Sequence, residues 1–162
     1  MTMKLIIAFF FLFFSFHSYG QNYILPEGEF MDTIINKDVI CKDYNLFFYQ
    51  VGGKYPKSSS ALLSEVLSFL KQKNKLDAGT GYITFQFKID CTGKKLRRTQ
   101  VLQTDETYKN FHFDRELVNE LYLFLNSLDK WKIAKNKEGQ NFVYKAFITF
   151  KINNGKVCNI IP

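Results

Sequence analysis

The stretch from Gly81 to Asp90, GYITFQFKID, decides the fold that the sequence predicts. Apolar and polar side chains alternate strictly along it. The apolar set is Ile83, Phe85, Phe87 and Ile89. A period of two residues is typical of a β-strand that buries one face and leaves the other polar. The sequence therefore predicts a strand here whose apolar side faces a core.

A turn and a second strand follow this strand. The sequence DCTG, at positions 90 to 93, places Asp90 and Gly93 where a tight turn favours them. A second strand is predicted from about Lys95 to Gln103, which completes a hairpin. Its alternation is irregular, because its apolar residues cannot all share one face without a bulge. We therefore expect a bulge or an edge position in this strand.

Two amphipathic helices are predicted around the hairpin. Apolar residues recur every three or four positions from Ser60 to Lys73 and from Asp114 to Leu128. The serines at 58 to 60 and Asp114 are suitable N-caps. Strand alternation resumes at 142 to 152, and NNG at 153 to 155 predicts a turn into a short final strand. This order predicts an α+β fold, in which a small antiparallel sheet packs against helices.

The first 20 residues, MTMKLIIAFFFLFFSFHSYG, predict export. A lone early charge at Lys4, an apolar run, and small residues at Ser18 and Gly20 are typical of a secretory signal peptide. We expect cleavage between Gly20 and Gln21 and a periplasmic or extracellular protein that does not span the membrane. The run is shorter than the about 20 residues that a membrane-spanning helix needs, so a retained anchor is the less favoured alternative.

Cleavage would remove 20 of the 162 residues and, with Lys4, one charge from the net formal charge of +7. The remaining length fits one domain. We divide it into an N-terminal arm at 21 to 57, interrupted by Pro and Gly, and an α+β domain at 58 to 162. The positive charge favours anionic lipid or acidic glycan as a partner, and nucleic acid is not expected for an exported protein.

Three cysteines remain after cleavage: Cys41, Cys91 and Cys158. In an oxidising compartment at least one pair is expected to form a disulfide, and three cysteines allow three pairings. A zinc site is disfavoured, because no two cysteines lie at zinc-knuckle spacing and His112 is the one histidine after residue 20. We expect no metal and no cofactor.

Catalytic patterns are weak throughout the chain. His112 lies in the aromatic sequence NFHFD, which we interpret as packing at the start of a helix. Lys94 and Lys95 could lower the pKa of a free Cys91 thiol, but disulfide formation is the favoured fate of that cysteine. The sequence has no phosphate-binding Gly loop and no Ser-His-Asp order. We therefore expect a protein that is not an enzyme.

The segment from Gly81 to Pro162 resembles the C-terminal domain of TonB proteins, a module of strand, strand, helix and strand. The resemblance rests on GYITFQFKID at 81 to 90, CTGK at 91 to 94, VLQT at 101 to 104, WKIAKNKEGQ at 131 to 140, and FITFKI at 147 to 152. The family usually carries Trp followed by a Pro-Ala pair, and then Gly before the last strand. Trp131, Ala134 and Gly139 match, whereas Ile133 stands where Pro is expected.

The resemblance implies a stand-alone protein of the Gram-negative cell envelope, in which Cys41 clips the arm to the hairpin tip at Cys91. It also implies a noncatalytic module whose sheet edge captures an extended segment of a protein partner by strand addition. The candidate strand is 142 to 152, with a fully paired core strand as the alternative. The partner-binding candidates on this strand are Phe142, Tyr144, Ala146, Ile148 and Phe150.

A second hypothesis assigns the binding of anionic lipid or glycan to the basic hairpin. Its candidate residues are Lys94, Lys95, Arg97 and Arg98. Neighbouring residues of a strand face opposite sides, so about half of these charges can form one patch. Strand addition requires an exposed backbone edge along 142 to 152. Anion binding requires that the hairpin charges gather with other lysines.

Overall fold

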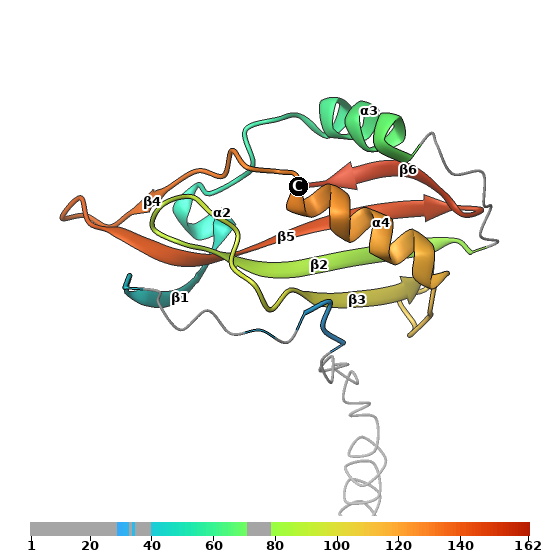
Figure 1. Ribbon diagram of the computed structural model, residues 1–162, viewed down its shortest axis with the longest axis horizontal. Helices are drawn as coiled ribbons and strands as arrows, with labels where there is room; N and C mark the ends of the chain where they lie inside the picture. Colours follow the sequence, from blue (N-terminus) through green and yellow to red (C-terminus); the bar gives the residue numbers. More distant parts are fainter. Residues whose placement is uncertain (1–28, 33, 35–39, 71–78) are drawn as a thin grey trace, which may run out of the picture.

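The computed structural model describes residues 29–32, 34, 40–70 and 79–162 (Figure 1). The predicted signal peptide and its cleavage site lie outside them. Within them the chain has a mixed α/β fold, with a six-stranded sheet and three helices. The strands are β1 (Asp43–Phe47), β2 (Gly81–Ile89), β3 (Gln100–Asp105), β4 (Ala134–Lys135), β5 (Asn141–Asn153) and β6 (Lys156–Ile161). The helices are α2 (Phe48–Val51), α3 (Ser59–Leu70) and α4 (Arg115–Asn126).

The long strand β5 is the centre of the sheet (Figure 1). One edge of β5 pairs with β2 in antiparallel fashion from Tyr144 to Ile152. The other edge pairs with β1 in parallel at Val143 and Lys145, and with β6 in antiparallel fashion from Thr149 to Asn153. β3 pairs with the far edge of β2. The predicted sheet packed against helices is confirmed at this level, and β1 adds a parallel pair that was not predicted.

Burial alternates residue by residue along β2, as predicted. Its apolar side chains are buried beneath α3 and α4 in one core. Its polar side chains and their direct partners on β5 lie on the opposite side, which we call the open face. The cross-strand pairs of the open face are Tyr82 with Lys151, Thr84 with Thr149, Gln86 with Phe147, and Lys88 with Lys145.

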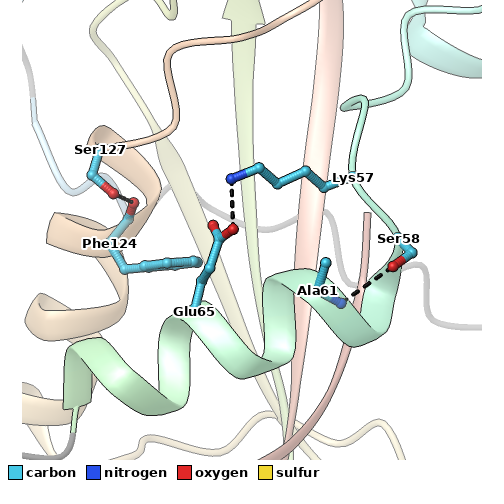
Figure 2. A network of polar contacts seen from close by, with 6 residues as sticks. All are labelled: Lys57, Ser58, Ala61, Glu65, Phe124 and Ser127. Atoms are coloured by element: carbon cyan, nitrogen blue, oxygen red, sulfur yellow. Dashed lines mark hydrogen bonds and ion pairs between the residues drawn. The ribbon is translucent and has the colours of Figure 1, made fainter.

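The two predicted helices form, and their starts are capped by side chains. Asp114 accepts hydrogen bonds from the N–H groups of Glu116 and Leu117, which confirms it as the N-cap of α4. Ser58 Oγ accepts from the N–H of Ala61 at 3.2 Å at the start of α3 (Figure 2). Residues 71 to 73 of the predicted helix lie outside the described residues.

Two contacts position α3, and Figure 2 draws the first of them, which joins the segment before the helix to the helix itself. Lys57 Nζ pairs with Glu65 Oε1 at 2.6 Å. Phe69 of α3 meets Phe124 of α4 in an edge-to-face contact, with the ring centroids 5.7 Å apart. The two helices therefore form one layer over the sheet.

The second strand of the hairpin starts later than predicted, at Gln100 instead of about Lys95. After the turn, the chain follows β2 only through the bridge between Ile89 and Lys95 and the bond from Leu96 N to Lys88 O. Arg98 then has a φ of +65°, which lies outside the extended range of a regular β-strand. The expected irregularity is therefore a break in the strand, and pairing resumes only after it.

Three turns of the fold share one geometry. They begin at Asp90, Asp105 and Asn136, whose side-chain oxygens accept from the N–H groups two and four positions further on. The residue three positions on has a positive φ in each turn, and these residues are Gly93, Tyr108 and Gly139. Glycine adopts this conformation without steric cost, whereas tyrosine does not.

The predicted N-terminal arm contributes directly to the sheet. Met31 N donates to Thr99 O at 2.8 Å, and Val101 N donates to Glu29 O at 2.9 Å, so the arm covers the outer edge of β3. The chain then forms β1 and the short helix α2, which ends at Gly52 with a φ of +61°. A helix in this region was not predicted.

A disulfide joins Cys41 to Cys91, and Cys158 is a free, exposed cysteine. This is the pairing that the resemblance implied, and it is confirmed. The bridge ties the residue two positions before β1 to the turn after β2. It therefore brings β1 and the basic hairpin to the same end of the open face.

Candidate functional site

A pocket of about 490 Å³ lies at this end of the open face. Segments far apart in the sequence form its walls. The arm contributes Phe30, β1 contributes Asp43, and β5 contributes Lys145, while β2 and the hairpin line the remaining walls. Leu96 adds apolar surface. We call this site the cationic pocket, because basic side chains from three segments reach it.

Four of the side chains that line the pocket are cationic: Lys88, Arg97, Arg98 and Lys145. Lys88 and Lys145 are direct cross-strand partners of β2 and β5. Like charges directly opposite each other destabilise a sheet. The carboxylate of Asp43 relieves part of this repulsion. The pocket still holds more cationic than anionic side chains among the described residues, and this excess favours a negatively charged ligand.

Asp43 is the one carboxylate among the described residues that line the pocket. Lys88 Nζ donates to its Oδ2, and Asn45 N donates to its Oδ1 at 2.8 Å. Burial alone would raise the pKa of Asp43, but the hydrogen bonds from Lys88 and Asn45 and the charges of Lys88 and Lys145 hold it below its ordinary value. Asp43 is therefore ionised at neutral pH, and it offsets one of the four positive charges.

Two of the cations rest on aromatic rings. The guanidinium of Arg98 lies 5.2 Å from the ring centre of Phe30, and Lys145 Nζ lies 5.3 Å from that of Phe47. The backbone N–H of Arg98 also donates to the Asp32 carboxylate, which holds the residue in its positive φ. A ring orients a cation without neutralising it, so both charges remain able to attract a ligand.

The structure divides the predicted basic patch. Arg97 and Arg98 line the pocket, whereas Lys94 is exposed at the turn and does not line it. Lys95 points into a largely buried site, where Nζ donates to Thr99 Oγ1 at 2.7 Å and lies 5.3 Å from the ring centre of Tyr122. Burial lowers the pKa of Lys95 below its ordinary value.

Sequence reasoning did not place Lys88 and Lys145 in the site. The alternation along β2 puts Lys88 on the polar face and was a usable signal for it. Lys145 could be found only with the register of β2 and β5 in hand, because the two lysines are 57 positions apart. Asp43 reaches the pocket because β1 pairs in parallel with β5. The local sequence around Asp43 contains no pattern that predicts this pairing.

The candidate strand for partner capture is a paired core strand. Its proposed contact residues Phe142, Tyr144, Ala146, Ile148 and Phe150 are all buried. Pairing with β2 covers one edge of the strand, and β1 and β6 together cover most of the other. The strand therefore offers no long run of unpaired backbone to a partner. The prediction did not identify β1 and β6 as two partners of the same edge.

The residues weighed for catalysis have other contacts. His112 Nε2 and Glu29 Oε1 form a surface pair at 2.6 Å. Cys91 is in the disulfide. Among the residues that the structure describes, no three of His, Cys, Asp and Glu are placed to hold a metal ion together.

Comparisons with protein-family models, with curated proteins and with solved structures found no match for this chain. In the part of the chain that the structure describes, the helices are too short or too polar to cross a membrane.

Proposed function

We propose that this chain is an exported, noncatalytic binding module of the cell envelope that holds an anionic ligand in the cationic pocket. One observation carries the proposal: Lys88, Arg97, Arg98 and Lys145 come from three separate segments to one pocket, where Asp43 is the one carboxylate among the lining residues that the structure describes. The anion-binding hypothesis required that the hairpin charges gather with other lysines. Arg97 and Arg98 support it by lining the pocket with Lys88 and Lys145, whereas Lys94 and Lys95 do not line it.

The ligand would place its anionic group between the two strand lysines and the hairpin arginines. Arginine presents a planar fork of donors that matches a carboxylate or a phosphate, and lysine adds a mobile point charge. The apolar surface of Phe30 and Leu96 would contact the uncharged part of the ligand. The pocket would therefore select a charged group attached to a less polar body.

Export and family membership are part of the same proposal. The signal-like sequence at 1 to 20 and the disulfide support export. The order β2, β3, α4 and β5 supports a TonB C-terminal-like module within residues 81–162. In that interpretation β1 and β6 are additions to the module, and β1 supplies one wall of the pocket.

The test is an NMR titration of the mature, disulfide-bonded protein with inorganic phosphate and with galacturonate. We expect backbone shifts that concentrate at Lys88, Arg97 and Lys145. Arg97→Gln and Lys145→Gln should each weaken binding about fivefold to tenfold, as the loss of a charged hydrogen bond implies. Lys94→Gln removes the same charge outside the pocket and should bind as the parent does. Shifts that avoid the pocket, or equal losses in all three variants, would refute the proposal.

A second candidate function is capture of an extended peptide at the outer edge of β3. The observation that favours it is the pairing of Met31 with Thr99 and of Glu29 with Val101, by which the chain's own arm lies along this edge in extended form. A peptide of residues 27 to 34, EGEFMDTI, added to the Asp32→Ala variant should shift the amide of Val101. A peptide of the same composition in scrambled order is the control, and equal shifts with both would exclude specific capture.

A further inference from the structure

We infer that the ligand is an extended acidic glycan that leaves the cationic pocket and runs along the open face to Tyr82 and Tyr108. The inference rests on the proposed function, since the pocket is one end of the path. The juxtaposition that carries it is a row of cross-strand pairs with cations at both ends, hydrogen-bonding side chains between them, and an exposed tyrosine at the far end.

The register of β2 and β5 gives the length of the path. Lys88 and Lys145 mark the pocket end, and Tyr82 and Lys151 mark the other. Six residues of β-strand separate the two ends, which is about 20 Å at 3.3 Å per residue. A monosaccharide cannot span this distance, whereas a short oligosaccharide can. The open face therefore fits a chain better than a single sugar.

In the two cross-strand pairs at the middle of the path, three side chains can hydrogen-bond, and the fourth is Phe147, the partner of Gln86. Thr84 Oγ1 and Thr149 Oγ1 lie 2.9 Å apart as a cross-strand pair. Gln86 and Gln100 stand next to them, where the path enters the pocket. Hydroxyl and amide groups both donate and accept hydrogen bonds, as the hydroxyl groups of a sugar require.

The far end carries an aromatic platform beside a cation. The ring of Tyr108 stacks on that of Tyr82, with centroids 5.2 Å apart and planes at 4°. Tyr108 is 69% exposed, so its outer surface is open to a ligand. Lys151 is the exposed cross-strand partner of Tyr82. The C–H face of a sugar packs well on an aromatic ring, and its carboxylate would reach Lys151.

The backbone at Tyr108 supports a functional role for this side chain. Its turn has the same geometry as the turns that contain Gly93 and Gly139, yet a tyrosine stands where those turns have glycine. A positive φ costs a tyrosine about 1 kcal/mol or more. Strain of this kind is found mostly where a side chain serves binding or catalysis. An exposed tyrosine kept at a strained position is therefore best explained by a contact with a ligand.

The chemistry of the path favours a glycan over a membrane surface. A membrane-binding face inserts apolar side chains and keeps its basic residues at the rim. Here threonine and glutamine occupy the middle, and Phe147 is half-buried against Phe47 and Phe48. Cations at both ends match an acidic group repeated along a chain.

The experiment measures affinity of the mature protein for galacturonate and for oligogalacturonates from the disaccharide to the octasaccharide, by calorimetry at one ionic strength. We expect affinity to rise with length up to about the tetrasaccharide. Tyr108→Ala and Lys151→Gln should each weaken binding of the tetrasaccharide about fivefold, which is close to 1 kcal/mol, and leave binding of galacturonate unchanged. Lys137→Gln, which removes an exposed charge away from the open face, is the matched control.

Tyr108→Gly separates a lost contact from lost folding. Glycine relieves the strain of the positive φ, so this variant should fold as well as the parent and still lose the length-dependent affinity. The glycan path would be overturned if affinity did not change with chain length and the Tyr108 and Lys151 variants bound the tetrasaccharide as the parent does. The proposal of an anion-binding pocket would not be affected by that result. Binding to phosphatidylglycerol vesicles without binding to any oligosaccharide would also overturn it. Loss of galacturonate binding is instead a failure of the pocket itself.

Discussion

Gly93 and Gly139 occupy the same place in two turns of the same geometry, with φ of +82° and +81°. They differ in their surroundings. A Cβ at Gly93 would come within 2.9 Å of the backbone oxygen of Trp131, whereas a Cβ at Gly139 would meet nothing within 4 Å. The pair therefore separates the cost of backbone conformation from the cost of a clash.

We predict that Gly139→Ala lowers the free energy of unfolding by about 1 kcal/mol, because alanine is strained at positive φ. Gly93→Ala should lower it by about 2 to 3 kcal/mol, since the clash with the Trp131 carbonyl is added to the same strain. Urea denaturation of both variants measures the difference. Equal decreases in unfolding free energy would mean that the backbone at Trp131 moves away from the added methyl group without a free-energy cost.

The hydroxyl of Tyr144 holds two loops together inside the core. It donates to Lys132 O at 2.6 Å and lies within donating distance, 3.2 Å, of Gly53 O. Tyr144→Phe leaves these carbonyls without that donor, and we expect a loss of about 1 to 2 kcal/mol in unfolding free energy at neutral pH. Tyr82→Phe, on the open face, is the control and should change the stability by less.

The same residue gives a prediction about pH. Burial raises the pKa of Tyr144 to about 12 from the ordinary value of 10.0. Its contribution to stability is therefore complete below pH 10 and is lost as the pH rises through 10 to 12, where the unfolded chain ionises first. The difference in unfolding free energy between the parent and Tyr144→Phe should change by about 2 kcal/mol over this range, so the advantage of the parent closes or reverses. A gap that stays constant with pH would show that the hydroxyl is accessible to water.

At the scale of elements, β3 and β6 are two edge strands of the described sheet, and the chain itself protects each of them. The arm at 29 to 31 pairs with β3. On β6 a register irregularity interrupts the strand, and the side chain of Asn159 accepts from the N–H of Ile160. Bulges and self-capped N–H groups are common protection against edge-to-edge association. A ligand at the open face is therefore easier to accommodate than a partner strand at the edge of β3 or β6.

Asp32 fastens the arm to this edge. Its carboxylate accepts hydrogen bonds from the Tyr122 hydroxyl and from the N–H groups of Arg98 and Thr99. Burial would raise the pKa of Asp32, but these hydrogen bonds hold it below 3.8. The carboxylate therefore stabilises the arm above about pH 4, and this contribution is lost as the pH falls below that value.

We predict that Asp32→Ala increases hydrogen exchange of the Met31 and Val101 amides about tenfold or more at neutral pH, because the arm opens without unfolding the sheet. The amide of Phe85 in β2 should keep its protection. The protection factors of the parent should fall with acid below pH 4, and those of the variant should not. Glu138→Ala, a charge loss at an exposed turn, is the control. Simultaneous loss of protection at Phe85 would contradict an arm that opens independently.

The elements that local pattern could predict are those whose own sequence carries the signal. The alternation of β2 and β5 and the N-cap Asp114 were identified because each depends on neighbours a few positions away. The start of β3 was misplaced, since nothing in the composition marks the positive φ of Arg98. β1 is a strand because it pairs with β5. This pairing depends on residues about 100 positions away in the sequence, so a local pattern could not predict it.

The candidate site was predictable to a smaller degree for the same reason. The run of basic residues in the hairpin predicted a role for Arg97 and Arg98, and both line the pocket. Their neighbour Lys95 belongs to a buried polar contact with Thr99, because the chain turns between them. The remaining charges, Lys88, Lys145 and Asp43, meet only once three strands are aligned.

At the scale of the whole molecule, the Cys41–Cys91 disulfide links two of the segments that line the pocket, β1 and the hairpin after β2. It fixes the start of β1 to the end of β2 across a sequence separation of 50 residues. Cys41 and Asp43 line the same pocket as the hairpin arginines. The covalent bond therefore stabilises the fold and also sets the distance between two pocket walls.

We predict that Cys41→Ser combined with Cys91→Ser lowers the free energy of unfolding by about 4 kcal/mol, the value that chain entropy assigns to a loop of this length. Binding of galacturonate should weaken as well. Without the disulfide, only the short pairing with β5 keeps β1 in place as a wall of the pocket. Cys158→Ser is the matched control: its thiol is exposed and unbridged, so stability should change by less than about 0.5 kcal/mol and binding should not change. Urea denaturation and calorimetry on the three proteins measure both effects. A double variant that is less stable yet binds with the parent's affinity would mean that the sheet positions the cations without help from the bridge.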